Sequence, residues 1–364
     1  MKIVYVVSDS PEEWNSAEWR CAIPARAIQS TRQHQATLIR IDHFAYHTPE
    51  AMAACTEADI IVIQRNAFGP VLQAMQYWKA RDKTIILDFD DAYHLMPPQV
   101  RNYTFWIEGR IVQNGPDGKP FSTVIQPPPL TQFQWGLQLA HAATTPSRLL
   151  AADWRAHAAV HYLPNYLDLP RYLNLKPLPH ERIIIGWGGS LSHLQSFTES
   201  GVIKALRRIC IRRPQVQILI CGDERVFHAL DVPESQKRFQ PWTAPENWPQ
   251  YLAMFDIGIA PLHGAYDQRR SWIKVLEYMI MKIPWVASQG APYEELKDFG
   301  SLVRNDPYAW EEALIEMIDH LDLYKERAAQ EPYLFALGQS VQENVGAILN
   351  TYAQIRQSTF PTQV

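Results

Sequence analysis

The stretch GWGGSLSH, which begins at Gly186, combines glycine and hydroxyl residues in an order suited to binding an anion. It follows an apolar run and precedes a helical pattern, so it should connect the carboxyl end of a strand to a helix. Backbone N–H groups and a helix N-terminus can face a phosphate at such a turn. Gly188 and Gly189 would allow close backbone approach, and Ser190 adds a hydroxyl donor. A tight turn with a serine cap is the alternative interpretation.

The stretch RRSWIKVLEY, which begins at Arg269, places positive charge at the start of a predicted helix. Ser271 is the expected N-cap, so Lys274 falls in the first turn, where a cation opposes the helix dipole. That unfavourable placement indicates a functional demand, such as holding a diphosphate. Glu277 would lie about 9 Å beyond the cap along the axis, which matches the offset from a diphosphate to its ribose. A surface pair of Lys274 with Glu277 is the alternative.

Two further groups of charged residues follow predicted strands in the first half of the chain. In LDFDDAYH, Asp90 and Asp91 crowd beside a third carboxylate, and their mutual repulsion implies a purpose or a partner. Helix N-capping by either aspartate is the alternative. After the first strand, Asp9 and Arg20 are the charged candidates, and a surface ion pair of Arg20 with Asp9 or Glu18 is the alternative for them.

Short apolar strands alternate with helical stretches along the chain, which is typical of parallel α/β sheets. The expected strands are 2–7, 36–41, 59–64, 84–89, 143–145 and 160–163, followed by 182–187, 216–221, 238–240, 256–261, 285–288 and 301–303. The expected helices are 23–33, 69–80, 147–155, 193–212, 249–255, 271–281 and 308–330. The pattern therefore predicts two α/β domains in succession.

Proline-rich segments interrupt this alternation. Residues 97–130 contain the turn signal NGPDG between two short strand patterns, and we interpret them as a hairpin insertion. The pattern halts again in PNYLDLP, the expected linker, so we predict an N-terminal domain at 1–166 and a second domain at 167–331. The remaining segment, 332–364, carries an apolar helical stripe that must be buried. The stripe consists of Leu334, Leu337, Val341, Val345, Ile348, Leu349 and Tyr352.

The composition is that of an ordinary globular protein. The 364 residues are 47% hydrophobic and carry a net charge of −4, so no basic field is available to hold a nucleic acid. The apolar runs are too short to span a bilayer, and the N-terminal run lacks the features of a signal peptide. The four cysteines show no C-x-x-C spacing and the histidines no H-E-x-x-H pair. We therefore expect buried reduced thiols, no metal site and a cytoplasmic location.

Several segments, in their order and spacing, resemble the donor-binding signature of GT-B glycosyltransferases of the GT4-like superfamily. They are FDIGIAPL at 255–262, SWIKVLE at 271–277 and IPWVAS at 283–288, with IIGWGGS at 184–190 and YLPNYLD at 162–168 upstream. The resemblance implies two Rossmann-like, doubly wound domains that face each other across a cleft. It also implies that a C-terminal helix crosses back from the second domain to the first.

The resemblance assigns roles on the donor side. Glu277 resembles the glutamate that contacts the nucleotide ribose. Lys274 and the loop from Gly188 to Ser190 resemble the groups that bind the diphosphate of the donor.

The resemblance also assigns roles in the first domain. The loop that carries Asp90, Asp91 and His94 lies over the donor sugar and the acceptor in the family, so these side chains would bind sugar hydroxyls or act as a base. The loop with Asp9 and Arg20 borders the acceptor. Arg20 would there bind an acidic acceptor or the donor phosphate.

The chain departs from the family pattern in two places. The first glutamate of the family's E-x7-E motif would fall at Arg269, and the usual R-x4-K pair after the first strand of the second domain is missing. The missing glutamate contacts the donor sugar in the family, so the departure bears on the identity of the sugar and on the stereochemical outcome. Arg269 and Arg270 can supply the missing positive charge, because a planar guanidinium binds a diphosphate bidentately.

We therefore expect a glycosyltransferase that moves a sugar from a nucleotide-sugar donor to a hydroxyl acceptor, with retention of configuration and without a metal or another cofactor. The sequence leaves the acceptor open among glycans, lipid-linked glycans, protein side chains and modified DNA bases. Peripheral membrane association and the oligomeric state are also left open. A nucleotide-sugar-binding or scaffolding protein with a decayed site, and an epimerase of the same fold, are the alternatives.

Overall fold

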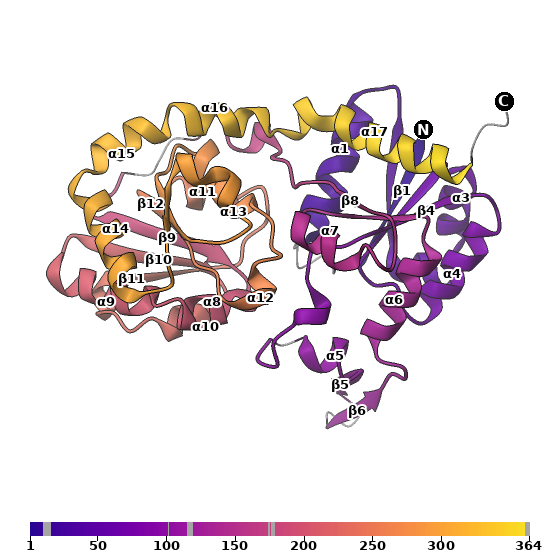
Figure 1. The fold of residues 1–364 in the computed structure, drawn as a ribbon, viewed down its shortest axis with the longest axis horizontal. Helices are drawn as coiled ribbons and strands as arrows, with labels where there is room; N and C mark the ends of the chain where they lie inside the picture. The colour runs from indigo at the N-terminus through magenta and orange to yellow at the C-terminus, as the bar shows by residue number, and fades with distance from the viewer. Residues whose placement is uncertain (10–15, 101, 115–118, 174, 176–178, 361–364) are drawn as a thin grey trace. The chain divides into compact units, whose positions relative to one another are not determined.

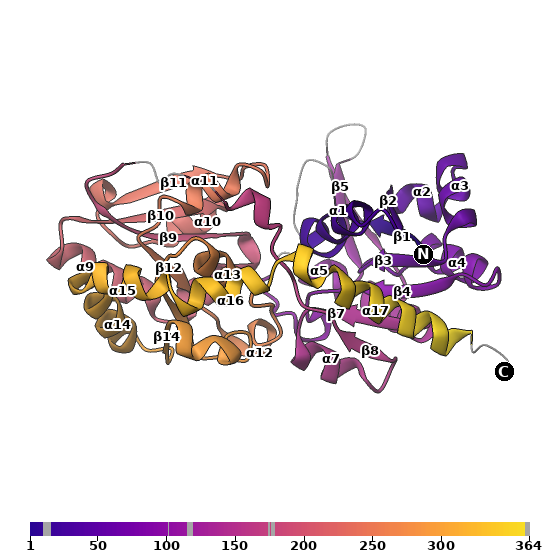
Figure 2. The same cartoon turned by 90° about the horizontal axis from the view of Figure 1, so that it is seen from above.

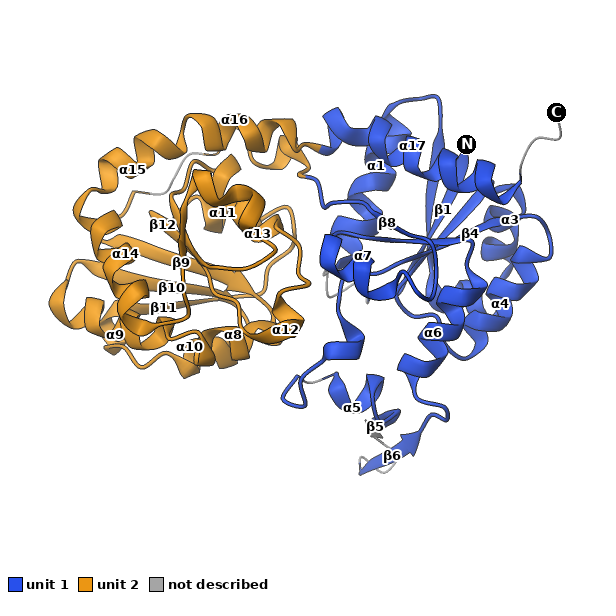
Figure 3. Ribbon diagram, in the orientation of Figure 1, with its two compact units in different colours: residues 1–166, 341–364 blue, residues 167–340 orange. Residues whose placement is uncertain are grey.

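The computed structural model of the chain describes residues 1–9, 16–100, 102–114, 119–173, 175 and 179–360. They form two compact units, which Figure 3 distinguishes by colour. Unit 1 comprises Met1–Tyr166 and Val341–Val364, and unit 2 comprises Leu167–Ser340. Each unit contains a parallel six-stranded sheet with flanking helices, so the two Rossmann-like domains expected from the sequence are confirmed.

The sheet of unit 1 has the strand order β2-β1-β3-β4-β7-β8, and every neighbouring pair is parallel. The strands are β1 Lys2–Val7, β2 Gln35–Arg40, β3 Ile60–Gln64, β4 Thr84–Asp88, β7 Ala142–Thr145 and β8 Val160–Tyr162. Apolar runs such as IIVIQ in β3 are buried along their whole length, as in strands covered on both faces. The order reverses between β1 and β3, where ligands bind in doubly wound sheets.

The helices of unit 1 follow the strands in alternation. They are α1 Ile23–Ser30, α2 Ile41–Ala45, α3 Pro49–Glu57, α4 Pro70–Lys79, α5 Tyr103–Trp106, α6 Pro129–Leu139, α7 Arg148–Trp154 and α17 Val341–Thr359. The expected hairpin insertion is present, because β5 (Arg110–Asn114) pairs antiparallel with β6 (Pro120–Val124). Its expected turn at 115–118 lies outside the described residues.

The sheet of unit 2 has the order β11-β10-β9-β12-β13-β14, again parallel throughout. Its strands are β9 Ile183–Gly189, β10 Val216–Gly222, β11 Lys237–Pro241, β12 Ile257–Ala260, β13 Trp285–Ser288 and β14 Ser301–Val303. Its helices are α8 Leu194–Glu199, α9 Val202–Arg212, α10 Glu224–Ala229, α11 Trp248–Leu252, α12 Gly264–Asp267, α13 Ile273–Ile280, α14 Pro307–Asp319, α15 Leu321–Ala328 and α16 Glu331–Gly338. The order reverses between β9 and β12, which places the ligand crevice of this fold class beside the end of β9.

Two different helix layers cover the sheet of unit 2. Helices α9 and α14 pack on one face, over a core that includes Trp187 and Ile257. Helix α13 packs on the other face, where a Cβ added to Gly258 would lie 2.6 Å from the Tyr278 ring. Figures 1 and 2 show α16 beside α13. The single helix expected at 193–212 is instead divided, because Gly201 adopts a left-handed conformation with φ of +87°.

The last helix, α17, packs in unit 1. It contacts α1, and its residues Ile348, Tyr352 and Ile355 are buried in the same core as β1 (Figure 1). The Tyr5 hydroxyl donates to the Tyr352 hydroxyl at 3.2 Å. Helix α16 stays in unit 2, where Leu334 is exposed, so the expected boundary at residue 332 is too early and the chain returns to unit 1 at Val341.

The burial of α17 predicts that Ile348→Ala destabilises unit 1 selectively. Removing a buried aliphatic side chain costs about 2–5 kcal/mol of unfolding free energy. Backbone amides of β1 and α1 should therefore exchange hydrogen faster, while those of β9 and β10 keep their protection. Hydrogen exchange resolved along the chain measures both effects. Leu334→Ala, at an exposed position of α16, is the matched control, and unchanged protection of unit 1 in Ile348→Ala would contradict the prediction.

Candidate functional site

The glycine-rich turn lies at the end of β9, as expected. Its glycines are required by the packing of neighbouring side chains. A Cβ on Gly188 would lie 2.1 Å from the Trp248 indole, and a Cβ on Gly189 would lie 2.7 Å from the Trp187 indole. Both positions must therefore be glycine for the two indoles to pack, whether or not a ligand approaches. The Ser190 hydroxyl lies 3.0 Å from that of Ser192, and Ser190 makes no side-chain cap on the helix that follows.

Lys274 is directed at this turn from the first turn of α13. Its Nζ donates to the Gly188 carbonyl and lies 4.9 Å from the centroid of the Trp187 ring. Desolvation lowers the pKa of the half-buried Lys274 ammonium, and the nearby Arg270 charge lowers it further. The expected alternative, a surface pair with Glu277, is therefore not what the side chain forms. The expected cap is wrong, since Trp272 and not Ser271 occupies the N-cap position of α13.

Glu277 is 6% exposed and is held by two neutral donors. Its Oε1 accepts hydrogen bonds from the Tyr172 hydroxyl at 2.8 Å and from the Trp248 indole nitrogen at 2.7 Å. Burial raises the pKa of the Glu277 carboxyl, and the two hydrogen bonds and the Lys274 charge partly oppose that rise. Trp248 thus touches both the glycine turn and the carboxylate, which brings Gly188 and Glu277 into one site.

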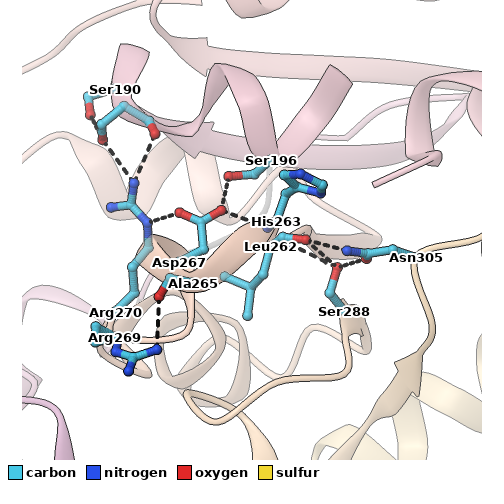
Figure 4. A network of polar contacts seen from close by, with 11 residues as sticks. Ser190, Ser196, Leu262, His263, Ala265, Asp267, Arg269, Arg270, Ser288 and Asn305 are labelled. Carbon is cyan, nitrogen blue, oxygen red and sulfur yellow. Dashed lines mark hydrogen bonds and ion pairs between the residues drawn. The ribbon is translucent and has the colours of Figure 1, made fainter. Parts of the chain in front are cut away.

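Arg270 joins the loop after β12 to the loop after β9 (Figure 4). Its Nε donates to Asp267 at 2.7 Å, and its Nη2 donates to the Ser192 carbonyl at 2.9 Å. Asp267 also accepts from the Ser196 hydroxyl at 2.5 Å and from the His263 backbone N–H at 2.7 Å. Arg270 therefore has a buried counter-ion and positions two loops, a role that the sequence did not indicate.

Arg269 forms its hydrogen bond with a different partner from those of Arg270. Its Nη1 donates to the Ala265 carbonyl at 3.2 Å, within the short helix α12 (Figure 4). The two adjacent guanidiniums therefore bond to different residues of unit 2.

His193 is a further member of the site that the sequence analysis did not select. Its Nδ1 is buried and has no hydrogen-bond partner among the described residues. Burial and the charges of Arg270 and Lys274 hold the pKa of His193 well below its usual value, so the imidazole is neutral. The neutral ring adds no positive charge to that of Arg270 and Lys274, and the nearby anions are Asp267 and Glu277.

In unit 1, Arg20 is a buried structural residue. Its guanidinium forms two hydrogen bonds with the Asp88 carboxylate, at 2.9 and 2.7 Å, and a third and fourth with the Leu163 carbonyl and the Asn165 side chain. The exposed fraction of its side chain is 3%. Both expectations for Arg20 are therefore wrong: it is neither available to an acceptor nor part of a surface pair, because Glu18 pairs instead with Arg26.

Asp9 organises the loops after β1 and β3. Its carboxylate pairs with Arg65 and accepts from the Ala17 backbone N–H at 2.8 Å and from Gln64 at 3.1 Å. The Arg65 backbone N–H donates to the Asp88 carbonyl at 2.7 Å, so the ends of β3 and β4 are tied together. The side chain of Asp9 is 3% exposed, which makes it a support for the loops and not a ligand contact.

Asp90 differs from Asp88 in its hydrogen bonding. Its Oδ1 is buried and accepts no hydrogen bond from the described residues. Burial and the adjacent Asp91 carboxylate raise the pKa of Asp90 to about 7, against the charges of Arg65 and Arg20. The expected helix cap does not form, since the short 3-10 turn that follows has Ala92 at its N-cap.

His94 lies within that turn and contacts α7. Its Nε2 is 3.1 Å from the Asp153 carboxylate, and its ring packs on Trp154 with the centroids 4.8 Å apart. The described residues contain no group of three or more His, Cys, Asp or Glu side chains placed to hold a metal ion. No helix within those residues is both long enough and apolar enough to cross a bilayer.

Known proteins share this architecture and part of this sequence. Residues 184–320 match the family model described as Glycosyl transferases group 1. The chain is similar in structure to sucrose-phosphate synthase from Thermosynechococcus elongatus, with a TM-score of 0.63, 12% identity and coverage of 98% of this chain and 99% of that one. No curated protein sequence matches the chain.

Two other solved structures cover nearly the whole chain. The catalytic domain of starch synthase IV from Arabidopsis thaliana, bound to ADP and acarbose, aligns with a TM-score of 0.62, 10% identity and coverage of 98% of this chain and 99% of that one. A putative UDP-N-acetylglucosamine 2-epimerase from Listeria monocytogenes aligns with a TM-score of 0.54, 12% identity and coverage of 100% and 97%. At these identities the structural likeness establishes the fold alone, since one architecture serves several activities.

The family match is a match of sequence, and it can be placed on the elements of unit 2. It spans the loop after β9, the Arg270–Asp267 network and all of α13, which together form the site in unit 2. The chain therefore has the GT-B fold of these glycosyltransferases, and residues 184–320, within its second unit, match the Glycosyl transferases group 1 model.

Proposed function

We propose that this glycosyltransferase binds a nucleotide-diphosphate sugar in unit 2 and transfers the sugar to a hydroxyl acceptor. One observation supports the proposed donor site. Lys274 donates to the Gly188 carbonyl, and the Trp248 indole, which packs on Gly188, donates to Glu277. A cation and a carboxylate one turn apart are thereby held around one glycine turn. Their spacing suits a diphosphate and the ribose attached to it.

In the proposed complex, Lys274 exchanges the Gly188 carbonyl for a diphosphate oxygen. The ammonium then stabilises the negative charge that develops on the departing nucleotide, which is the main contribution that a preorganised cation makes to such a reaction. Arg270 keeps the loop of Ser192 in place beside it. The Glu277 carboxylate accepts hydrogen bonds from the ribose hydroxyls, and it accepts them most strongly when it is ionised.

On the side of the acceptor, we assign the central role to Asp90. Its buried and unsatisfied Oδ1 is an acceptor of the kind that would hold a sugar hydroxyl, and Asp91 and His94 stand in the same loop. The proposed transfer retains the anomeric configuration and takes place in the cytoplasm. The acceptor belongs to the class of glycans or other hydroxyl compounds.

Lys274→Ala and Glu277→Ala should each weaken donor binding while the fold stays intact. Loss of a charge-assisted hydrogen bond corresponds to a roughly ten- to hundredfold loss of affinity. Calorimetric titration with UDP, GDP and dTDP, and with their sugars, measures the effect and identifies the nucleotide. Lys282→Ala, at an exposed position just after α13, is the matched control. If both variants bind the nucleotide like the unsubstituted protein, the donor site is misplaced.

Asp90→Asn should reduce kcat/KM about ten- to hundredfold and leave donor affinity unchanged, because a carboxylate that accepts a hydrogen bond is replaced by a weaker acceptor. With the pKa of Asp90 raised to about 7, activity of the unsubstituted enzyme should fall as the pH drops through 7, since the protonated carboxyl is a weaker acceptor than the carboxylate. The variant should lack this acidic limb. Asp82→Asn, at an exposed position of unit 1, should behave as the unsubstituted enzyme does. A retained limb in Asp90→Asn would assign the titration to another group.

Transfer should proceed without a divalent metal. Cationic side chains beside the glycine turn can stabilise the departing diphosphate in its place. Initial rates should therefore be the same with and without EDTA. Loss of activity in EDTA that is restored by magnesium or manganese would contradict the prediction and would turn attention to Asp90 and Asp91 as ligands.

A further inference from the structure

The carboxylate of Glu277 is held in an asymmetric way. Both of its protein hydrogen bonds, from Tyr172 and from Trp248, fall on Oε1. A carboxylate oxygen has two lone pairs in the carboxylate plane, so Oε1 is saturated by these two donors. Oε2 accepts no hydrogen bond from the described residues. The carboxylate is therefore fixed in rotation with one oxygen occupied and one oxygen available.

The two donors come from segments far from Glu277 in the sequence. Tyr172 follows the short 3-10 turn Leu169–Arg171, at the point where the chain has just entered unit 2, and Trp248 is the first residue of α11. The neighbouring Arg171 pairs with Asp168 at 3.2 Å and with Glu246 at 3.6 Å. The Arg171–Asp168 pair lies within the segment of Tyr172, and the Arg171–Glu246 pair connects that segment to the segment of Trp248.

The chemistry of Tyr172 and Trp248 suits them to donate hydrogen bonds to Glu277. Burial and the Glu277 charge raise the pKa of Tyr172 well above its usual value, so its hydroxyl stays protonated and donates. An indole N–H is a donor only. Both groups therefore remain donors to Glu277.

We propose that Tyr172 and Trp248 are positioning residues for the donor: they hold Glu277 by one oxygen so that Oε2 meets the ribose hydroxyls of the nucleotide. This inference rests on the proposed donor site. Tyr172 lies outside the segment that matches the family model, which begins at residue 184. The ribose contact would thus depend on a residue of the segment that leads into unit 2.

Tyr172→Phe in the full chain tests the proposal. It removes the hydroxyl and keeps the ring, and it should weaken binding of the tightest nucleoside diphosphate among UDP, GDP and dTDP about three- to thirtyfold. KM for the donor should rise while kcat changes less than twofold. Trp248→Phe removes the second donor and should act in the same direction.

The pH profile of binding separates positioning from a merely structural role. The charged and titratable groups that face Glu277 are Lys274 on its own helix and Arg171 and Tyr172 on the segment that enters the unit. Loss of the Tyr172 hydrogen bond removes a contact that favours the ionised carboxylate, so the pKa of Glu277 rises further. Binding that needs the carboxylate should then decline at a higher pH in Tyr172→Phe than in the unsubstituted protein.

Tyr278→Phe is the matched control. Tyr278 follows Glu277 on α13, and its buried hydroxyl donates to the Ile259 carbonyl at 2.9 Å, so the variant loses a buried hydrogen bond without touching the carboxylate. Its affinity and pH profile should be unchanged. Unchanged affinity and pH profile in Tyr172→Phe, with weak binding in Glu277→Ala, would overturn the positioning role alone. Full binding in Glu277→Ala would overturn the donor site and this inference together.

Discussion

A buried carboxylate must be paired, and each unit meets that constraint with an arginine near the carboxyl ends of its strands. Asp88 is 1% exposed and Asp267 is 3% exposed, and removing such charges from water costs several kcal/mol unless a cation and hydrogen bonds replace the solvent. Arg20 and Arg270 supply both. Each arginine also bonds to backbone carbonyls of another segment, so the loops around the sites take their places from these two pairs.

Groups with displaced pKa values gather beside these pairs. Burial raises the pKa of Glu277 and lowers the pKa of Lys274, which means that each charge is only partly compensated in the free protein. His193 and Asp90 carry buried polar atoms that have no hydrogen-bond partner in the part of the chain that the structure describes. Such groups are unfavourable for folding, and they cluster where a charged or hydroxylated ligand would relieve them. The Arg20–Asp88 and Arg270–Asp267 pairs thus hold the loops in which these unsatisfied groups lie.

The sheets could be predicted from the sequence because apolar runs and turn signals are local, and so could Lys274 and Glu277. The hydrogen-bond partners of Arg20 and Glu277 could not be predicted, because they lie 68 positions from Arg20 and 29 and 105 positions from Glu277 along the chain. Local signals also misled. The expected helices do not include α6, although Pro129 begins this helix, where its missing N–H costs nothing.

The two places at which the chain enters and leaves unit 2 lie side by side. The Leu167 backbone N–H donates to the Gln339 carbonyl at 2.9 Å, and Leu167 forms an isolated bridge with Ser340. A unit whose ends adjoin can be exchanged between proteins as one piece. Because Tyr172 stands just inside that boundary, a piece that begins at Leu167 carries all the residues of the proposed ribose contact. A graft that starts at β9 would keep the sheet and the glycine turn and would leave behind the tyrosine that holds the carboxylate.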